Sequence, residues 1–472
     1  MNPLIQFEKI CLVCVVVLAC YGLSPALNAN TITVTNTNDS GPGSLREALA
    51  VAIDGDTIDA RGISGTILLT TGELQVAHTV RIKGPGAGNL AVDGNATSRV
   101  FENFASSVTI SGFTITNGNS SEGGGILNHG GLTVSDSIVS SSQCPAGGVG
   151  GGICNLPGAT LKVIGSTING NHCSCLGGGI YTRNAQLTVV NSTISDNKTG
   201  LLFWCETAGG GIYYDGAGTV TVTNSVISRN DDGSSGGGIS GGAIGSVGVT
   251  TTVSVKDSTI SGNSAHAGGG IYKAGGRLTV TNSTISGNQA PPRGTGAGGG
   301  IWNAMGALVV TNSTISGNQA SLGGGIVNTA PGNFIVTNST FSNNSINNSG
   351  STRIGDTVLK STPIFNYFGP LVGTVTSLGY NLASHNGGGF LTGPGDQINT
   401  DPMLGPLRDN GGRTFTQALL PGSPAINAGN PNFTPPPDFD QRGPGYPRVV
   451  NGRIDIGSFE VQITPTPTPT PP

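Results

Sequence analysis

The feature that most constrains the fold is an internal repeat that occurs eight times. Each unit contains a glycine cluster similar to GGGI, a gap of variable length, an alternating L-x-V segment and a segment similar to N-S-T-I-S-G-N. The clearest copies of the last two segments are Leu278–Asn288 and Leu308–Asn318. An apolar residue of the S-T-I segment falls at positions 138, 168, 194, 227, 260, 285, 315 and 341, a mean spacing of 29 residues. A chain that repeats at this interval is expected to fold as a repeating structure.

Within each unit apolar and polar residues alternate, as at Leu278 and Val280 or around Ile285. This period of two is typical of strands that bury one face, and the unit has no helical spacing. Three short strands per unit, separated by Gly and Asn turns, predict one coil of a solenoid. Each strand then pairs in parallel with its counterpart on the next coil, about 4.8 Å away. The predicted fold class is therefore an all-β parallel solenoid.

Composition excludes several other classes. Glycine accounts for 80 of the 472 residues, but in clusters rather than at every third position, which excludes collagen. Hydrophobic residues make up 36%, which excludes a disordered chain. The net charge is −4 without any Lys/Arg run, so we expect neither a nucleic-acid partner nor an anionic membrane. An asparagine recurs at one turn of each unit, namely Asn191, Asn224, Asn282, Asn312 and Asn338. Asparagine tolerates left-handed backbone and can form amide ladders, so we predict a structural role for it rather than glycosylation of the N-S-T triplets.

The two ends differ from the repeats. Residues 1–29 contain the apolar run Ile10–Leu18 followed by small residues, which predicts a signal peptide and a secreted or cell-surface protein. No transmembrane segment is expected after cleavage, and a lipoprotein signal ending at Cys20 is the alternative. Residues 30–75 are predicted to form an N-terminal cap, in which Ser44 and Glu47 make a capping box that starts a short helix. The β-helix repeats occupy residues 76–350, terminal coils and an irregular region follow over 351–460, and an extended Pro/Thr tail covers 461–472.

Three parts of the chain resemble a group of bacterial surface proteins. Thr31–Ala48 (TITVTNTNDSGPGSLREA) is similar to their N-terminal CSLREA-type segment, with Gly43 where that name places Cys. The GGGI and N-S-T-I-S-G-N units resemble polymorphic-outer-membrane-protein repeats and, more broadly, the pectate-lyase-like right-handed parallel β-helix. SLGYNL at 377–382, TDPMLGPL at 400–407 and the motifs through Glu460 are similar to the C-terminal region called choice-of-anchor Q. The resemblance implies an exported, surface-displayed, single-stranded right-handed parallel β-helix with a short capping helix and an irregular C-terminal region.

The same resemblance raises the question of catalysis, because many right-handed β-helices cut acidic polysaccharides. A lyase of that class needs carboxylates on neighbouring coils to hold Ca²⁺, and an Arg or Lys base above them. The best cluster is Asp196, Asp231 and Asp232 on two successive coils, with Arg229 and Lys198 nearby. Solvated turn carboxylates are the simpler interpretation, so we assign no catalytic residue, metal site or cofactor. A Ca²⁺-dependent polysaccharide lyase centred on these aspartates is the alternative.

A match to polygalacturonases is rejected. Fragments at Asn230-Asp231-Asp232, Asn128-His129-Gly130 and Arg81-Ile82-Lys83 resemble motifs of that family, but their order along the chain is reversed. Because sequence order is spatial order in a solenoid, Arg81 and Asp231 are expected about five coils apart. Carboxylates must flank a single bond for glycoside hydrolysis, and this spacing forbids it.

After removal of residues 1–29 the chain keeps five cysteines. Cys173 and Cys205 each lie seven residues before the Ile of the following GGGI, which predicts equivalent positions on adjacent coils and a disulfide between them. Cys144 can pair with Cys154 or Cys175 in a second disulfide. A zinc site at the His-Cys-x-Cys segment that begins at residue 172 is disfavoured in an exported protein.

The residue after the GGGI isoleucine forms a column along the solenoid, read as Leu127, Cys154, Tyr181, Tyr213, Ser240, Tyr272, Trp302 and Val327. If the isoleucine faces inward, this neighbour faces outward. Tyr181 with Tyr213, and Tyr272 with Trp302, then form two stacked pairs on one face. Aromatic rings cover sugar faces well, so we predict a glycan-binding strip. The alternative is an exterior ladder that stabilises the strands or packs beneath a loop.

These observations predict a non-enzymatic, exported β-helix with an adhesin-like or structural role. It would present its loops and the aromatic strip to extracellular polysaccharide or cell-surface glycans. A purely structural envelope protein without a ligand and the polysaccharide lyase are the alternatives.

Overall fold

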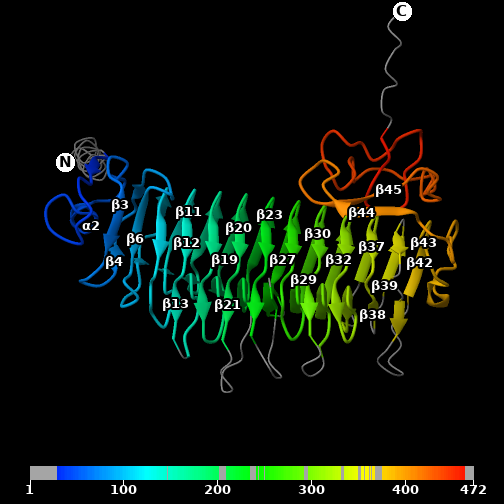
Figure 1. Ribbon diagram of the computed structural model, residues 1–472, viewed down its shortest axis with the longest axis horizontal. Helices are drawn as coiled ribbons and strands as arrows, with labels where there is room; N and C mark the ends of the chain where they lie inside the picture. The colour runs from blue at the N-terminus through cyan, green and yellow to red at the C-terminus, as the bar shows by residue number, and fades with distance from the viewer. Residues whose placement is uncertain are drawn as a thin grey trace, which may run out of the picture.

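A computed structural model describes residues 29–145, 147–200, 209–233, 241–242, 244–248, 250–291, 296–330, 334–348, 352–355, 357–360, 362, 364–366 and 375–462. Over these residues the chain winds into a parallel β-solenoid of about 11 turns, which we call coils. Figure 1 shows the result as a rod whose strands lie side by side across its long axis. The all-β parallel solenoid predicted from the repeat is confirmed.

The strands stack in three columns. The first holds the I-x-N strands: β4 (Leu74–Val76), β7 (Phe101–Asn103), β10 (Ile126–Asn128), β14 (Ile153–Asn155), β18 (Ile180–Arg183), β22 (Ile212–Asp215), β26 (Ile244–Val247), β29 (Ile271–Thr281), β32 (Ile301–Thr311), β35 (Ile326–Asn328), β38 (Ile346–Asn348) and β41 (Ile364–Asn366). The second holds the L-x-V strands, to which β29 and β32 also extend: β1 (Thr31–Thr33), β2 (Thr57–Asp59), β5 (Arg81–Lys83), β8 (Val108–Ser111), β11 (Gly131–Ser135), β15 (Thr160–Ile164), β19 (Gln186–Val190), β23 (Thr219–Thr223), β27 (Thr252–Lys256), β36 (Phe334–Thr337), β39 (Thr352–Gly355) and β42 (Val375–Gly379).

The third column holds the T-I-S strands: β3 (Gly65–Leu68), β6 (Leu90–Asp93), β9 (Thr114–Thr116), β12 (Ile138–Ser140), β16 (Thr167–Asn169), β20 (Thr193–Ser195), β24 (Val226–Ser228), β28 (Thr259–Ser261), β30 (Thr284–Ser286), β33 (Thr314–Ser316), β37 (Thr340–Ser342), β40 (Val358–Lys360) and β43 (Leu382–Ala383). Short bridges after this column are β13 (Gln143–Cys144), β17 (His172–Cys173), β21 (Lys198–Thr199), β25 (Asp231–Asp232), β31 (Gln289–Ala290) and β34 (Gln319–Ala320). The pairings between coils in all these columns are parallel.

The alternation of the repeat places its apolar side chains in one continuous core. Ile285 pairs with Ile315 on the next coil, and both are fully buried. In the first repeat the buried marker is Val139, which pairs with Ile168, and not Ile138, which pairs with Thr167. The marker at position 138 was therefore assigned one residue too early.

Asparagine stabilises the coils at two positions of the repeat. The turn asparagines expected to adopt left-handed backbone do so, with φ between 47° and 51° at Asn191, Asn224, Asn282, Asn312 and Asn338. The asparagine that ends N-S-T-I-S-G-N is buried instead, and its Nδ2 donates to the Oδ1 of the next coil's asparagine at 2.9 to 3.1 Å. This ladder runs through Asn171, Asn197, Asn230, Asn263, Asn288, Asn318 and Asn344. Each buried amide thereby meets its hydrogen-bonding needs from its neighbours.

A short helix, α2 (Leu45–Val51), covers the first coils as predicted. Its N-cap is Ser44, whose Oγ accepts a hydrogen bond from the backbone N–H of Glu47 at 3.2 Å. Glu47 accepts in return from the N–H of Gly43 rather than that of Ser44. Leu45, Ala48 and Leu49 are buried against the core. None of the helices within the described ranges is long and apolar enough to cross a membrane.

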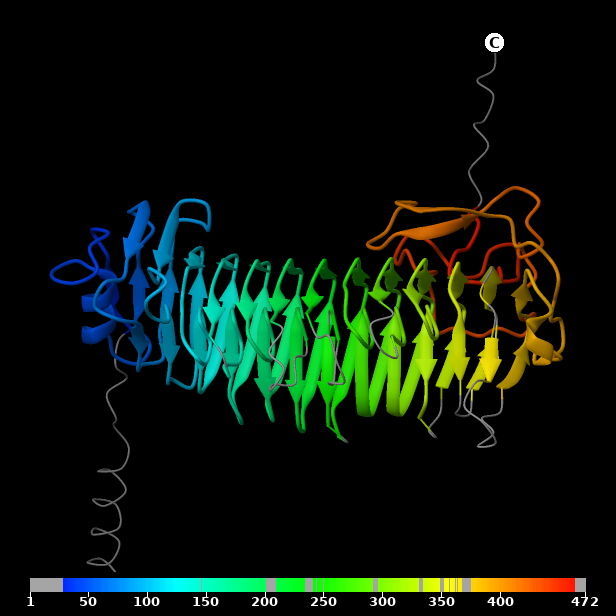
Figure 2. The ribbon, with the colours of Figure 1, turned by 60° about the horizontal axis from the view of Figure 1, so that its bottom comes forward.

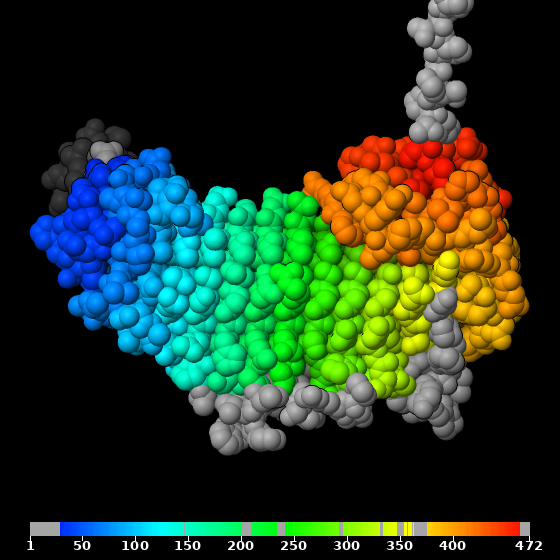
Figure 3. All heavy atoms as spheres, viewed as in Figure 1, coloured from blue at the N-terminus to red at the C-terminus, as the bar shows by residue number. Residues whose placement is uncertain are grey.

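The last described segment folds back over the rod instead of extending it. Figures 1 and 2 both show residues from about 400 onward lying across the last coils, with the antiparallel pair β44 (Leu404–Arg408) and β45 (Thr416–Leu419). This C-terminal region sits on the outward hydroxyls of the third column: Thr314 donates to Gln441 Oε1 and Ser342 to Gln417 Oε1, each at 2.6 Å. Figure 3 shows the surface of the middle coils hollowed between the raised first coils and this region.

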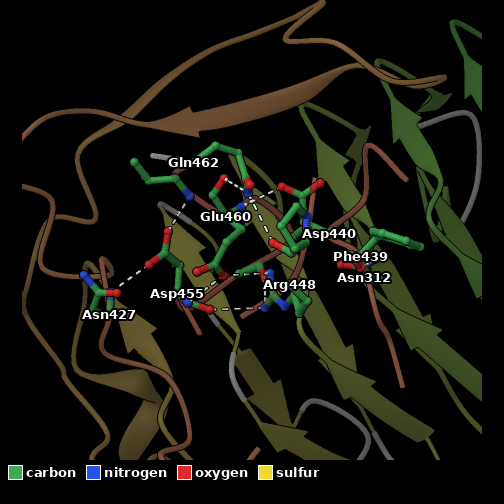
Figure 4. Close-up of polar contacts among 12 residues, drawn as sticks. Asn312, Asn427, Phe439, Asp440, Arg448, Asp455, Glu460 and Gln462 are labelled. Atoms are coloured by element: carbon green, nitrogen blue, oxygen red, sulfur yellow. Dashed lines mark hydrogen bonds and ion pairs between the residues drawn. The ribbon is translucent and has the colours of Figure 1, made fainter. Parts of the chain in front are cut away.

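Buried charged side chains hold the C-terminal region together (Figure 4). Arg442 Nη2 contacts Asp440 Oδ2 at 2.6 Å, and both side chains are buried. Arg448 is fully buried and donates from Nη2 to the backbone oxygen of Asp455 at 3.1 Å, while its Nη1 lies 3.8 Å from Glu460 Oε2. Burial raises the pKa of Glu460 to about 8 against the attraction of Arg448. The C-terminal region is thus held by these buried charged groups together with an apolar cluster that includes Leu404, Leu419 and Ile456.

Candidate functional site

The face predicted to carry the aromatic strip is formed by one outward position of the first column, which we call the outward column. In register it runs Gln75, Glu102, Leu127, Cys154, Tyr181, Tyr213, Gly245, Tyr272, Trp302 and Val327. The sequence predicted Ser240 in this column, but Gly245 holds that position, because strand β26 begins at Ile244. Ser240 lies outside the described residues. The column also extends two coils further toward the N-terminus than the glycine clusters indicated.

Tyr181 and Tyr213 are neighbours on adjacent coils, as predicted. Their rings are stacked, with centroids 5.9 Å apart and an interplanar angle of 16°. Only 6% and 5% of their surfaces are exposed, because they pack with Leu127 and Cys154 and beneath Leu176. Burial raises the pKa of Tyr181 to about 12. Tyr181 and Tyr213 therefore fit the alternative to a glycan-binding strip, which is an exterior ladder packed beneath loops.

Tyr272 and Trp302 also pair in register, and both are partly exposed. Their centroids are 5.5 Å apart at 84°, so the rings meet edge to face instead of stacking. Trp302 Nε1 donates to Thr329 Oγ1 at 3.4 Å, which orients the indole. Gly245 precedes Tyr272 in the column and adds no side chain on that flank. A role in glycan binding stays a prediction for this pair.

The three aspartates of the alternative lyase site are engaged separately. Asp196 pairs with Arg229 at 2.7 Å, and this contact holds the pKa of Asp196 below its usual value. Asp231 lies 3.2 Å from Lys198, and Asp232 is buried and accepts from Thr199 Oγ1 at 2.9 Å. Within the described part of the chain no three His, Cys, Asp or Glu side chains are grouped so that they could hold a metal ion.

The predicted disulfide between Cys173 and Cys205 is wrong. Cys173 is bonded to Cys144, with the two Cα atoms 4.6 Å apart on the paired strands β13 and β17. Cys175 is disulfide-bonded as well, Cys154 is free and buried, and Cys205 lies outside the described residues. Val139 and Ile168 are the buried residues of the S-T-I-S segment on these two coils, and they pair in register. Cys144 lies five residues after Val139, and Cys173 lies five residues after Ile168. Loop length before GGGI varies, so counting backward from GGGI selected the wrong partner.

A cluster of ionisable side chains at the N-terminal end of the outward column was not predicted. Arg99 Nη1 lies 2.8 Å from Glu73 Oε2 and 3.3 Å from Glu102 Oε2. His129 Nε2 lies 3.0 Å from Glu102 Oε1, and its ring stacks on exposed Phe104 with centroids 4.8 Å apart. Arg99 is fixed by two further hydrogen bonds, from Nε to the backbone oxygen at residue 122 and from Nη2 to the hydroxyl at residue 120. Four side chains from three successive coils therefore converge.

The two carboxyl groups of this cluster differ electrostatically. Burial, followed by a hydrogen bond with Glu102, raises the pKa of Glu73 above its usual value. Burial also opposes ionisation of Glu102, but hydrogen bonds with Glu73 and His129 outweigh it and lower the pKa of Glu102. Protonation is therefore favoured at Glu73 over Glu102.

A cleft of about 660 Å³ opens between helix α2 and strand β4 beside this cluster. Leu49 and Ala50 line it from the helix, Gln75 from the strand, Glu73 from the residue before the strand, and His78 from the segment after it. Its volume lies in the range of small-ligand sites. The sequence signal that could have found the cluster is the outward column itself, since Glu102 precedes Leu127 by one coil.

Comparison with known proteins supports the fold assignment. The family model of the right-handed β-helix region matches residues 65–243 and 205–359, which together span more than half of the chain. No curated protein matches. Among solved structures, a PL6 alginate lyase in complex with a trisaccharide has 14% identity and a TM-score of 0.50 over 86% of this chain and 93% of that chain. The alginate lyase AlyF-OU02 with G6 has 15% identity and a TM-score of 0.49 over 86% and 93%. Pectate lyase Pel9A has 14% identity and a TM-score of 0.38 over 93% and 98%.

At 14% identity the likeness to the PL6 alginate lyase extends to the fold alone. The family match covers the coils that carry the repeat and the outward column. This chain belongs to the right-handed β-helix family.

Proposed function

We propose that this protein is an exported, surface-displayed β-helix of adhesin-like role that binds extracellular polysaccharide without cutting its backbone. The observation that carries the proposal is the pair Tyr272 and Trp302, which lie side by side and partly exposed on one outward face. Rings in this position offer apolar faces to pyranose rings, while their polar atoms remain near water. The resemblance of the chain ends to bacterial surface proteins supports display at the surface.

Export has independent support from the cysteines. The disulfide between Cys144 and Cys173 and the bonded state of Cys175 suit an oxidising compartment outside the cytoplasm. We expect the mature protein to begin near Ala26 or Ala29, which N-terminal sequencing of the exported protein would test. A mature N-terminus at Cys20 would indicate the lipoprotein alternative.

Binding is tested by passing the full-length protein over immobilised polygalacturonate, alginate, xylan and cellulose. Retention is expected on at least one of them, and Tyr272→Ala/Trp302→Ala should weaken it by about tenfold, since one ring at a time can lie flat on a sugar and that contact is worth ~1.4 kcal/mol. Phe415→Ala is the matched control, because Phe415 is an exposed aromatic residue of the C-terminal region. Equal retention of the double variant and the wild type would remove the aromatic pair from the proposal.

The same experiment separates the lyase alternative. A lyase centred on Asp196, Asp231 and Asp232 would release unsaturated sugars that absorb in the ultraviolet when Ca²⁺ is present. We expect no such release, because Asp196 and Asp231 each face a cation of the neighbouring coil, Arg229 and Lys198, instead of converging on one point.

A further inference from the structure

The outward side chains of the third column are covered at one end of the rod and open in its middle. On β30, β33 and β37 the first outward residues, Thr284, Thr314 and Thr340, are at most 1% exposed, because the C-terminal region lies on them. The corresponding residues of the six preceding strands are partly or fully exposed, and we call them the floor: Thr114, Ile138, Thr167, Thr193, Val226 and Thr259. The floor lies in the hollow between the raised first coils and the C-terminal region (Figure 3).

The floor has the chemistry of the covered surface beside it. Four of its six residues are threonines, the residue type through which β30, β33 and β37 bond to the C-terminal region. None of the six carries a charge, so a partner can cover them without burying an ion. Val226 takes the place of threonine on β24 and leaves an apolar side chain 40% exposed. The floor therefore continues an interface that this chain already forms with itself.

The C-terminal region presents apolar side chains on its outside. Five of the thirteen large hydrophobic residues exposed in the described ranges belong to it, namely Met403, Phe415, Leu420, Phe439 and Val449. Gln417 bonds to Ser342 of the coils and Leu419 is buried, so the alternation along β45 directs Leu420 away from the coils. Phe415 lies at the edge next to the floor, because its backbone oxygen accepts from Thr284 on the strand that follows β28. Apolar groups concentrated in this way favour contact with a partner.

The lengths of the two surfaces match. The C-terminal region contacts five strands of the third column, from β30 to β43, which is a span of about 19 Å at the usual strand spacing. The floor extends over six strands, from β9 to β28, which is a span of about 24 Å. A second C-terminal region therefore fits along the floor, between the raised first coils and the first C-terminal region.

We propose that two copies of this protein form a two-fold symmetric dimer in which the C-terminal region of each copy covers the floor of the other. The axis crosses the rod near β28, midway between the centre of the floor and the centre of the covered strands. One rotation about it places both C-terminal regions on both floors, so the contact is closed and adds no third copy. Each rod lies antiparallel on the other, and Val226 and Phe415 of each copy face the partner.

The area of this contact sets its strength. A floor about 24 Å long and about 10 Å wide, the length of a three-residue strand, provides about 240 Å². Each copy contributes a floor and the outside of a C-terminal region, which gives about 480 Å² per partner before the flanking walls are counted. That area lies at the lower end for specific interfaces, so we expect a dimer that dissociates on dilution.

Sedimentation velocity of the exported protein over about 1 to 100 µM tests the proposal, and a monomer–dimer transition is expected within this range. Val226→Asp and Thr193→Arg each place a charge on the floor, and Leu420→Asp places one on the outside of the C-terminal region. Each should raise the dissociation constant by at least about tenfold, because an unpaired charge becomes buried in the contact. Ile164→Asp is the matched control, since Ile164 is 36% exposed on the second column and outside the contact.

The outcomes separate this dimer from other forms of association. A wild type that stays monomeric over the whole range overturns the inference. A dimer whose dissociation constant is the same in all three variants also overturns it, since the copies then meet through another surface. Open-ended oligomers overturn the two-fold arrangement. Circular dichroism checks the fold of each variant, and Thr193→Arg decides for the floor if Val226→Asp unfolds.

Discussion

Replacing Lys273 by asparagine is expected to stabilise the β-helix at neutral pH. Lys273 is fully buried on β29, and its Nζ has no hydrogen-bond partner. The residues in register on either side, Ser246 and Asn303, also have a buried polar atom without a partner, Oγ and Oδ1 respectively. On the next coil the same position forms an amide ladder, since Asn303 Nδ2 donates to Asn328 Oδ1 at 2.7 Å. Asparagine at 273 would donate to Asn303 and accept from Ser246, and so satisfy both.

The magnitude follows from the cost of burying the charge. Burial lowers the pKa of Lys273 from 10.5 to about 8, which corresponds to about 3 kcal/mol of lost stability at pH 7. Two new hydrogen bonds contribute about 1 kcal/mol each, and a methyl-sized void left by the shorter side chain costs about 1 kcal/mol. The expected net gain in the free energy of unfolding of Lys273→Asn is therefore about 3 to 4 kcal/mol at pH 7.

The pH dependence gives a second, independent measurement. Between pH 8 and 10.5 the unfolded state binds more protons at Lys273 than the folded state, so wild-type stability rises with pH over this window. The advantage of Lys273→Asn should accordingly shrink between pH 8 and 10.5. Urea unfolding of both proteins across this range measures the difference, and Lys256→Asn, which removes an exposed lysine of β27, should change little. A variant less stable than the wild type at pH 7, or an advantage constant with pH, would refute the reasoning.

Three further predictions concern the covalent link and the C-terminal region. Replacing Cys144 and Cys173 together by serine should lower the free energy of unfolding by about 3 to 4 kcal/mol, given their sequence separation of 29, as measured by thermal unfolding. Gln441→Ala removes one hydrogen bond each from the buried hydroxyls of Thr284 and Thr314, which costs about 1 to 3 kcal/mol; proteolysis of residues 404–460 should accelerate while the coils stay resistant. Because the folded pKa of Glu460 is raised to about 8, its contribution to stability is complete below about pH 4.5 and is lost as pH rises through 8. Glu460→Gln should remove that decline in protease resistance.

The coils could be predicted from the repeat because every coil buries the same apolar positions and pairs the same strands. Alternation at Ile285 and Ile315 fixes which face is buried, and parallel pairing follows from the period. The partner of Cys173 was missed for a physical reason: register propagates from strand to strand, whereas loop length before the glycine cluster is free to vary. Counting from the S-T-I-S strand would have selected Cys144.

The C-terminal region could not be placed from the sequence. Its contacts with the coils join residues 75 to 157 positions apart, such as Ser342 with Gln417 and Thr284 with Gln441. No local period encodes such separations, and the hydroxyls that receive this region also occur on coils that it does not cover, for example at Thr259. The docking coils are the ones whose hydroxyls at Thr284, Thr314 and Ser342 bond to the C-terminal region.

Departures from the repeat supply the candidate functional residues, and the register determines which of them lie side by side. Tyr272 with Trp302 was found because both coils begin with a recognisable glycine cluster. Glu102 was missed because Phe101 replaces the isoleucine of GGGI on its coil and no glycine cluster precedes it, although Phe101 pairs directly with Ile126. Once the column is extended through that pair, a lone glutamate in the sequence becomes the neighbour of Glu73, Arg99 and His129. In a solenoid, therefore, each outward-facing position should be followed from coil to coil beyond the coils that carry a clear repeat motif. The N-terminal coils lack the glycine cluster, but their strands still pair in the same register.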